Sequence, residues 1–346
     1  MELIPYALVF REPYVTARGR LERRELALVR LRADGLEGLG EAAPLALRGG
    51  ADLAQILSDL ERCRPVLTNA ELNADTRELT GPCAATGACA QALLAIELAA
   101  WDLLGKAADA PLHRLLDAAA GPVRCNATLV AGAPDAVAAR AREWADQGFE
   151  TFKLKAGVDG DVDAVRAVRD VVPEDARIRV DANGVWSVDE AAARLAAMAP
   201  LELAEQPVAT LAELGALRAR VDTRIAADES VVTAADARTA AGVCDAATVK
   251  LAKAGSVHTA FEIAAQLPVY LSSALDGPVG IAAAAHVARA LPGDLAHGLA
   301  TSLLFADTIA ARECSVAGGH LHLTGGPGLG VEIDDAALAR RRIATV

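Results

Sequence analysis

The chain contains little that would suit it to a nucleic acid, an anionic membrane or an oxidising compartment. Aromatic residues make up 3% of its 346 residues, and acidic residues outnumber basic ones to give a formal net charge of −12. A phosphate backbone or an acidic lipid surface attracts a basic face, so this balance argues against both as partners. The six cysteines are scattered and form no Cys-x-x-Cys pair, which favours reduced thiols, as in cytosolic proteins.

Long uncharged apolar runs and leader-like segments are lacking as well. The most apolar helical stretch, residues 89–105, carries Gln91, Glu97 and Asp102, so it is typical of a buried helix and not of a membrane span. The first residues do not combine a basic segment with an apolar core, so no signal peptide is expected. We therefore expect a cytoplasmic protein without a membrane partner. The sequence leaves open whether it forms a homo-oligomer.

Five charged residues recur at nearly even intervals through the middle of the chain. Lys155, Asp181, Glu205, Asp228 and Lys250 are separated by 26, 24, 23 and 22 residues, and each ends a short apolar run. Stretches of helical composition lie between these runs. A strand, a helix and two loops occupy roughly 20 to 30 residues, so this interval is typical of a β/α barrel. The strands of such a barrel end at one mouth, which would gather the five groups in one pocket.

The rest of the chain fits a barrel joined to a smaller domain. Residues 1–45 have the alternating pattern of antiparallel strands. We predict an α+β capping domain at 1–121, a barrel at 122–317 and a terminal segment, 318–346, that folds back onto the capping domain. The eight parallel strands of the barrel are predicted at 123–130, 151–155, 178–181, 201–205, 224–228, 247–251, 268–273 and 295–301.

Three of the five strand-end groups are carboxylates. Asp181, Glu205 and Asp228 offer only oxygen ligands, which favour Mg²⁺, with Mn²⁺ as a substitute, over zinc. Without a cation, three carboxylates in one pocket would repel one another, and one of them would take up a proton. Asn183 and Arg179 are expected to support these ligands. The alternative interpretation is that each acid caps the helix that follows its strand.

The other two strand-end groups are lysines. Lys155 and Lys250 belong to the second and sixth predicted strands, on either side of the strands that carry the carboxylates, so a metal-bound substrate would meet one lysine on each face. Lys153 shares a strand face with Lys155, and its positive charge would favour the neutral form of Lys155, which can act as a general base. Lys253 is expected to be solvated. The alternative is that the lysines serve only as counter-ions.

These ordered motifs resemble the enolase superfamily, muconate-cycloisomerase branch. The resemblance implies a (β/α)7β barrel of the TIM type, capped by an α+β domain that both termini form. It also implies that Mg²⁺ on the three carboxylates stabilises an enediolate, which forms when a lysine removes a proton next to the carboxylate of a small-molecule substrate. The motifs are Lys153-Leu-Lys155, Asp181-Ala-Asn183-Gly184, Glu205-Gln206-Pro207, Asp228-Glu229-Ser230 and Lys250-Leu-Ala-Lys253-Ala-Gly255, with 96–106 and 327–330.

Within that branch the chain is most similar to the o-succinylbenzoate synthases, in particular those of the actinobacterial type. Segments 179–186, 205–214, 272–281 and 297–305 carry this likeness. It implies the Mg²⁺-dependent dehydration of 2-succinyl-6-hydroxy-2,4-cyclohexadiene-1-carboxylate in menaquinone biosynthesis, with one lysine as the base and the other across the ring. Segment 249–255 is closer to the cycloisomerases and dipeptide epimerases. A muconate-type cycloisomerase, a dipeptide epimerase and an N-succinylamino acid racemase therefore stay open.

Specificity is predicted to come from residues around the mouth. Ser272 and Ser273 at the seventh strand and Thr301 at the eighth are placed to bind a distal succinyl or carboxylate group, or are ordinary strand-end residues. The segment 14–24 is a candidate lid. Residues 297–301 lack the Asp-x-Asp with which dipeptide epimerases hold an ammonium group, which counts against an α-amino dipeptide.

Overall fold

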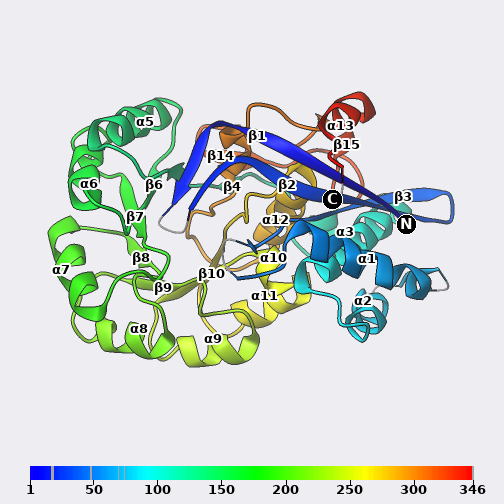
Figure 1. The fold of residues 1–346 in the computed structure, drawn as a ribbon, viewed down its shortest axis with the longest axis horizontal. Helices are drawn as coiled ribbons and strands as arrows, with labels where there is room; N and C mark the ends of the chain where they lie inside the picture. Colours follow the sequence, from blue (N-terminus) through cyan, green and yellow to red (C-terminus); the bar gives the residue numbers. More distant parts are fainter. Residues whose placement is uncertain (17–18, 47–48, 69, 74, 345–346) are drawn as a thin grey trace.

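A three-stranded antiparallel sheet and the helices that pack against it begin the chain, and a long series of β/α units follows (Figure 1). This computed structural model describes residues 1–16, 19–46, 49–68, 70–73 and 75–344. The N-terminal elements are β1 (Glu2–Thr16), β2 (Gly19–Ala33), β3 (Leu36–Ala42), α1 (Leu53–Leu67), α2 (Arg77–Ala84), α3 (Ala90–Ala107) and α4 (Leu112–Leu115).

Helix α3 lies directly against β3, and two glycines of the strand make this contact close. A Cβ atom at Gly40 would lie 1.8 Å from the carbonyl oxygen of Ala95, and one at Gly38 would lie 2.1 Å from that of Ala99. Only glycine fits at such a distance. Buried alanine, leucine and isoleucine side chains from this sheet and from α1 to α3 form a core of their own. Other side chains of the same sheet, among them Tyr6, Leu26 and Leu28, pack into the barrel core, so the N-terminal region contributes to both cores.

The β/α units form a parallel sheet in which neighbours in sequence are neighbours in space, in the order β11-β10-β9-β8-β7-β6-β5. Its strands are β5 (Ala127–Leu129), β6 (Thr151–Lys155), β7 (Arg177–Asp181), β8 (Leu203–Glu205), β9 (Ile225–Ala227), β10 (Ala246–Val249) and β11 (Val269–Leu271). The helices that surround them are α5 (Pro134–Asp146), α6 (Asp161–Arg169), α7 (Val188–Met198), α8 (Leu211–Arg218), α9 (Ala234–Ala240), α10 (Leu251–Ala254), α11 (Val257–Ala264) and α12 (Pro278–Ala290). The outer helices form an arc around the sheet in Figure 1, as expected for a TIM-like α/β fold.

The start of several helices is fixed by local sequence. Thr210 before α8 and Thr233 before α9 each accept a bond from the backbone three residues on, and Glu213 and Asp236 bond back to them. Such capping boxes satisfy backbone N–H groups that have no partner inside the helix. They therefore fix the residue at which each loop ends and its helix begins.

The predicted eighth strand at 295–301 is wrong as an extended strand. Two single parallel bridges stand in its place, Cys125 with His297 and Ser272 with Gly298, and they join the first and seventh barrel strands. The chain then turns into a 3₁₀ helix, η2 (Ala300–Leu304). Glycine is required at this closure, because a Cβ atom at Gly298 would lie 2.8 Å from the hydroxyl of Ser272. The barrel therefore closes through two residues and not through a full strand.

The predicted first barrel strand, 123–130, is two strands with different partners. The strand β4 (Val123–Arg124) pairs with β14 (His320–His322), which also pairs with β13 (Ser315–Ala317), and only β5 belongs to the barrel. The last elements are β12 (Ala310–Arg312), β15 (Glu332–Ile333) and α13 (Asp335–Arg341).

The C-terminal segment reaches the N-terminal sheet. Tyr6 of β1 forms an antiparallel bridge with Arg342, and an Arg30 side-chain nitrogen lies 2.5 Å from Asp335 Oδ1. Figure 1 shows α13 beside the long strands of that sheet. The division at residues 121 and 317 stays a prediction, and these contacts support the part of it that returns 318–346 to the capping domain.

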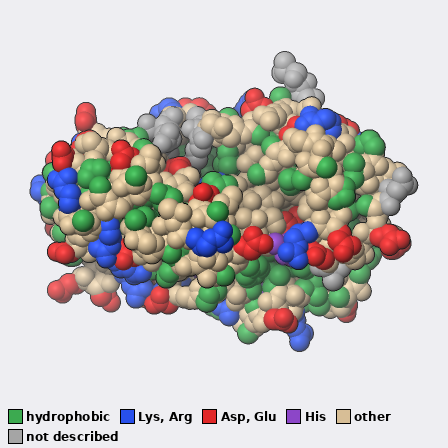
Figure 2. Space-filling model, turned by 90° about the horizontal axis from the view of Figure 1, so that it is seen from below, with side chains coloured by type: hydrophobic (Ala, Val, Ile, Leu, Met, Phe, Trp, Pro, Cys, Tyr) green, Lys and Arg blue, Asp and Glu red, His purple; other side chains and the backbone are tan. Residues whose placement is uncertain are grey.

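The surface carries both signs of charge. Figure 2 shows acidic and basic side chains interspersed over the face that it presents. Among the helices of the described residues, none is both long enough and apolar enough to cross a bilayer.

Candidate active site

The carboxyl ends of the barrel strands bring the five predicted charged residues together. Lys155, Asp181 and Glu205 are paired neighbours on β6, β7 and β8. Asp228 directly follows β9, and Lys250 directly follows β10 as the residue that precedes α10. The carboxylates are wholly buried, and the two lysines are 6% and 2% exposed. The structure therefore places these five residues together at one mouth of the barrel, as the sequence predicted.

Two lysines of β6 neutralise the first two carboxylates. Lys153 Nζ lies 3.0 Å from Asp181 Oδ2 and 2.6 Å from Glu205 Oε2. Lys155 Nζ lies 2.5 Å from Asp181 Oδ2. Burial alone would raise the pKa of Asp181, but Lys153 and Lys155 outweigh it and hold the pKa well below its usual range. Burial would likewise lower the pKa of Lys153, but Asp181 and Glu205 keep it well above its usual value.

Two further lysines contact the third carboxylate. Lys250 pairs with Asp228 Oδ2, and Lys253 Nζ lies 2.9 Å from Asp228 Oδ1. The side chain of Lys253 is 12% exposed, so the prediction that it is solvated is wrong. The short helix α10 explains this error, because it turns Lys253 back toward the strand end that Lys250 has just left.

The lysine content of the chain itself points to this cluster. The sequence contains five lysines, at 106, 153, 155, 250 and 253, among 34 basic residues. Four of the five therefore lie at the mouth. Arginine stays protonated under all ordinary conditions, whereas a buried lysine can lose its proton and act as a base. This count is the signal that could have placed Lys253 in the site.

The donor set suits a hard divalent cation, although the side chains are not arranged as a ready cage. Within the described ranges, no three His, Cys, Asp or Glu side chains form a group that could hold a metal as they stand. The acids are paired with lysines instead. Glu205 Oε1, however, is buried and has no hydrogen-bond partner among the described residues. A buried oxygen without a partner is costly, and a cation would satisfy it. The all-oxygen set of Asp181, Glu205 and Asp228 therefore fits Mg²⁺.

Two residues in left-handed backbone conformations shape the turns after the acidic strands. Asn183 has φ 51° and Gln206 has φ 37°. Asn183 accepts from Lys155 Nζ at 3.4 Å and donates to Glu229 Oε1 at 3.1 Å. Gln206 Oε1 accepts from the backbone N–H of Asp228 at 2.8 Å. These contacts are of the supporting kind predicted for Asn183, and Gln206 adds one that the sequence reasoning missed.

Arg179 acts through a residue that the sequence reasoning also missed. Its side chain is wholly buried, its Nε donates to Glu202 Oε2 at 2.5 Å, and its guanidinium carbon lies 4.8 Å from the centre of the Tyr270 ring. The hydroxyl of Tyr270 in turn donates to Glu205 Oε2 at 2.6 Å. Tyr270 precedes Ser272 by two residues on the seventh strand, so it points to the same side, and that alternation was its sequence signal.

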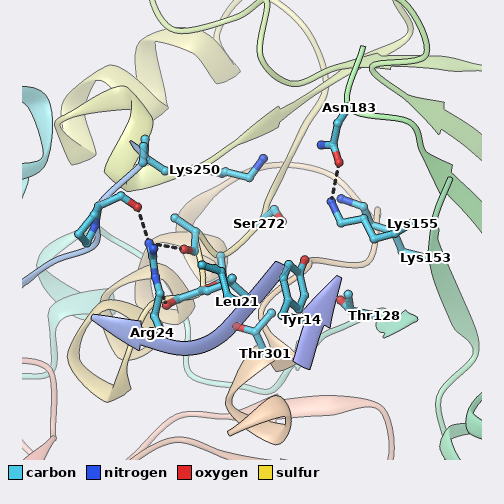
Figure 3. A pocket seen from close by; sticks show the side chains of 15 residues that line it. Tyr14, Leu21, Arg24, Thr128, Lys153, Lys155, Asn183, Lys250, Ser272 and Thr301 are labelled. Carbon is cyan, nitrogen blue, oxygen red and sulfur yellow. Dashed lines mark hydrogen bonds between the residues drawn. The ribbon is translucent and has the colours of Figure 1, made fainter. Parts of the chain in front are cut away.

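A pocket with about 750 Å³ of empty space, partly open to solvent, lies over the cluster. Figure 3 shows Lys250 on one side of it and Lys153 and Lys155 on the other, with Ser272 between them. The pocket is also lined by Asn183 and by residues of both domains, namely Tyr14, Leu21, Arg24, Pro44, Leu45, Thr128, Ser273, Ala274, Leu275 and Thr301.

The three predicted hydroxyl residues all border this pocket, but they differ in their partners. Ser273 Oγ is 2.9 Å from Asp276 Oδ2 and accepts from the backbone N–H of Asp276, so it stabilises a turn. Thr301 Oγ1 is buried and has no hydrogen-bond partner in the described part of the chain. Thr301 lies in η2 and not on a strand. Of the three, Thr301 is the hydroxyl best placed to bond a substrate.

The predicted lid at 14–24 is for the most part the end of a hairpin. Tyr14 belongs to β1, and Leu21 and Arg24 belong to β2, with Tyr14 paired to Leu21. Residues 17 and 18 lie outside the described residues. The three described side chains border the pocket, so the segment lies at the mouth as predicted, but as paired strands. Sequence alternation alone did not show which side chains point inward.

Comparison with known proteins adds two family matches. Residues 136–337 match the family described as "Enolase C-terminal domain-like", and residues 4–117 match "Mandelate racemase / muconate lactonizing enzyme, N-terminal domain". Together these matches cover most of the chain.

Curated relatives and solved structures extend these matches. An o-succinylbenzoate synthase of Mycobacterium ulcerans (strain Agy99) is 43% identical over 236 residues, which are 64% of this chain and 70% of that protein. One of Mycobacterium tuberculosis (strain ATCC 25618 / H37Rv) is 46% identical over 184 residues, 49% of this chain and 56% of that protein. A muconate lactonizing enzyme of Pseudomonas fluorescens, solved with muconolactone, has a TM-score of 0.92 at 28% identity and covers 99% of this chain and 98% of its own. A dipeptide epimerase of Enterococcus faecalis V583, solved with Mg and L-Leu-L-Tyr, has a TM-score of 0.90 at 29% identity and covers 96% and 98%.

Proposed function

The chain belongs to the enolase superfamily, with the N-terminal domain of mandelate racemase and muconate lactonizing enzymes, and from this premise we propose which reaction it catalyses. The reaction is the Mg²⁺-dependent dehydration of 2-succinyl-6-hydroxy-2,4-cyclohexadiene-1-carboxylate to o-succinylbenzoate. The observation that carries the proposal is the position of Lys155 and Lys250 on opposite sides of one pocket (Figure 3). Each of these lysines also contacts a buried carboxylate of the proposed metal site. The identity to the mycobacterial synthases favours this substrate over others of the superfamily.

In the proposed site, Asp181, Glu205 and Asp228 hold the cation. When bound, Mg²⁺ would neutralise the negative charge that develops on the substrate carboxylate as the neighbouring proton leaves. Lys153 stays protonated between Asp181 and Glu205, where it adds fixed positive charge to the same region. The supporting contacts of Asn183 and Tyr270 keep the acids in place.

Lys155 is the proposed base. It takes the proton from the ring carbon that bears the carboxylate and returns it to the hydroxyl of the adjacent carbon. That hydroxyl leaves as water, and the ring forms a new double bond between the two carbons. Lys155 must first lose a proton and open its contact with Asp181, because an ammonium group has no lone pair with which to accept a proton. Lys250, on the opposite face, stabilises the anionic ring by its charge. Thr301 and Ser272 are proposed to meet the distal succinyl group.

A dehydration assay tests this proposal. The purified protein is stripped of metal, given the cyclohexadiene substrate, and titrated with Mg²⁺ or Mn²⁺ while the aromatic product is followed by its absorbance. We expect turnover that appears with Mg²⁺, is lost on chelation and is at least partly supported by Mn²⁺. If a folded, Mg²⁺-loaded protein forms no product, the assignment is wrong.

Racemisation of N-succinylamino acids is the second candidate, because two lysines on opposite faces are also the arrangement that removes a proton from one face and returns it to the other. Exchange of the α-proton with solvent D2O, measured for both enantiomers, tests it. An α-amino dipeptide is disfavoured, because the segment 297–301 that closes the barrel supplies no carboxylate for its ammonium group.

A further inference from the structure

The loop that follows β11 forms one wall of the pocket and has an unusual backbone. Ala274 and Leu275 both line the pocket. Leu275 has φ 64°, a left-handed conformation that residues other than glycine and asparagine seldom adopt. Such a conformation persists only where the surrounding contacts impose it, and it often occurs at ligand sites. The contacts that impose it here are therefore of interest.

Part of the loop is held by its own residues. Asp276 Oδ2 accepts from the backbone N–H of Ala274 at 2.8 Å and lies 2.9 Å from the hydroxyl of Ser273. The backbone N–H of Asp276 donates to that same hydroxyl at 2.9 Å. These bonds close the turn but leave the carbonyl groups of Ala274 and Leu275 for other donors.

An arginine from the N-terminal sheet supplies those donors. Arg24 of β2, 9% exposed, donates through Nε to the carbonyl of Leu275 at 3.2 Å and through Nη2 to the carbonyl of Ala274 at 2.8 Å. The same Nη2 also donates to the carbonyl of Pro44, which lines the pocket from the segment after β3. Figure 3 shows this side chain reaching from the strand to the wall of the pocket. One guanidinium thus joins two walls that belong to different parts of the chain.

A carboxylate from the same sheet holds the other end of the loop. Glu41 of β3, 2% exposed, accepts from the backbone N–H of Gly277 at 2.6 Å and from that of Val279 at 3.2 Å, at the start of α12. The hydroxyl of Tyr6 donates to Glu41 Oε2 at 2.9 Å. A Cβ atom at Gly277 would lie 2.3 Å from the Tyr6 hydroxyl and 2.7 Å from Glu41 Oε2, so only glycine allows these two groups this close.

We propose that Arg24 and Glu41 form a clamp with which the N-terminal sheet sets the shape of the strand-seven wall, and that Arg24 is a positioning residue for the distal end of the substrate. The guanidinium group of Arg24 donates to carbonyl groups of the loop, and the carboxyl group of Glu41 accepts from its N–H groups. The loop is thereby fixed from 273 to 279 relative to Ser272, which borders the pocket beside it. This proposal rests on the proposed function for the identity of the substrate, but not for the clamp itself.

The test compares Arg24→Met and Arg24→Lys with Arg23→Met. Arg23 is the neighbouring residue, its side chain is 59% exposed, and its Nη2 lies 2.6 Å from Glu25 Oε1, so its variant removes an arginine without touching the loop. Arg24→Lys keeps the charge, but one ammonium group cannot reproduce the planar fork that reaches three carbonyl groups. If Arg24→Met does not fold, Arg24→Lys is the variant on which the proposal is tested.

Two measurements are made on each variant. Hydrogen–deuterium exchange of the peptide that spans 269–281, without substrate, should be about tenfold faster in both Arg24 variants than in Arg23→Met. In the dehydration assay at saturating Mg²⁺, KM should rise about tenfold to 100-fold in Arg24→Met, because the wall that meets the substrate is displaced. kcat should change less than about threefold, because the lysines and acids are untouched.

The outcomes separate the clamp from the proposed function. Unchanged exchange in the Arg24 variants overturns the clamp, whatever the substrate. Faster exchange with an unchanged KM overturns the positioning role. If the wild-type protein exchanges slowly at 269–281 but does not dehydrate the substrate, only the proposed function is wrong. The hydrogen–deuterium exchange of the Arg24 variants then still tests whether the clamp exists.

Discussion

The two walls of the pocket are held by contacts of different range. On the barrel side, Lys155 contacts Asp181, and Lys250 contacts Asp228, across 26 and 22 residues of sequence. On the capping side, Arg24 contacts Leu275 across 251 residues, and Glu41 contacts Gly277 across 236. The first kind follows from the order of strands in a barrel. The second depends on how two packed regions meet, so the chemistry of the site and its selectivity are built by different means.

Lys155→Arg should reduce turnover more than any other substitution, because it replaces the proposed catalytic base on the barrel side of the pocket. Arginine keeps the positive charge next to Asp181 but cannot lose a proton, so turnover should fall about 100-fold to 10,000-fold. Mg²⁺ binding, measured by calorimetry, should remain. Lys106→Arg is the matched control, since Lys106 pairs with Asp102 outside the cluster. Equal turnover in the two variants would show that Lys155 is not the base.

The barrel wall was also the more predictable of the two. The spacing of the charged residues predicted the strands that carry them, because each parallel strand needs one crossover of nearly constant length. The same rule failed at 295–301, where two bridged residues and a 3₁₀ helix replace the expected strand. Lys253 was misplaced because α10 begins directly at the strand end. Arg24 and Glu41 gave no periodic signal, since their partners are backbone atoms of a distant loop.

On the capping side, Glu41 should make stability depend on pH. Burial, and then the charge of Asp276, raises the pKa of Glu41 to about 7 from 4.5. The folded state therefore binds more protons than the unfolded chain between these values, so the free energy of unfolding should fall as pH rises from 4.5 to 7, by about 3 kcal/mol at most. Urea unfolding at pH 5 and pH 7.5 measures this.

Glu41→Gln should unfold more easily at both pH values, because its amide cannot accept from all the donors that face Glu41, but its dependence on pH should be weaker. Glu12→Gln, at an exposed residue, is the control. If the free energy of unfolding falls by the same amount between the two pH values in Glu41→Gln and in the wild type, Glu41 is not the source of the pH dependence.

Tyr270→Phe tests whether the Tyr270 hydroxyl holds Glu205 in place to bind the proposed metal. Tyr270 and Lys153 both occupy Glu205 Oε2, which leaves Oε1 for the cation. Loss of the Tyr270 hydroxyl should weaken Mg²⁺ binding about tenfold to 100-fold, as seen when outer-shell partners of metal ligands are removed. Calorimetric titration with Mg²⁺ measures it.

The matched control is Tyr6→Phe, which removes a buried tyrosine hydroxyl from Glu41 at the clamp. It should lower stability without changing Mg²⁺ affinity. Equal Mg²⁺ affinity in Tyr270→Phe and the wild type would contradict the support that we assign to Tyr270.

Thr301→Val should change activity the least, but it should raise both the stability of the free protein and KM. Its buried hydroxyl has no partner among the described residues, so valine should stabilise the free protein by about 1 kcal/mol while it raises KM about fivefold through the lost substrate contact. Thr248→Val is the control, because Thr248 Oγ1 is also buried without a partner in the described chain but does not border the pocket. It should gain stability with KM unchanged. Thr301 has no substrate role if both variants keep the wild-type KM.

The central claim is that this site dehydrates the cyclohexadiene substrate in preference to racemising N-succinylamino acids. The most direct test is to measure kcat/KM for both reactions with one Mg²⁺-saturated preparation. The account predicts a value in the usual enzymatic range, about 10⁴ M⁻¹s⁻¹ or more, for dehydration and a lower value for racemisation. A higher value for racemisation, or no dehydration, would contradict it.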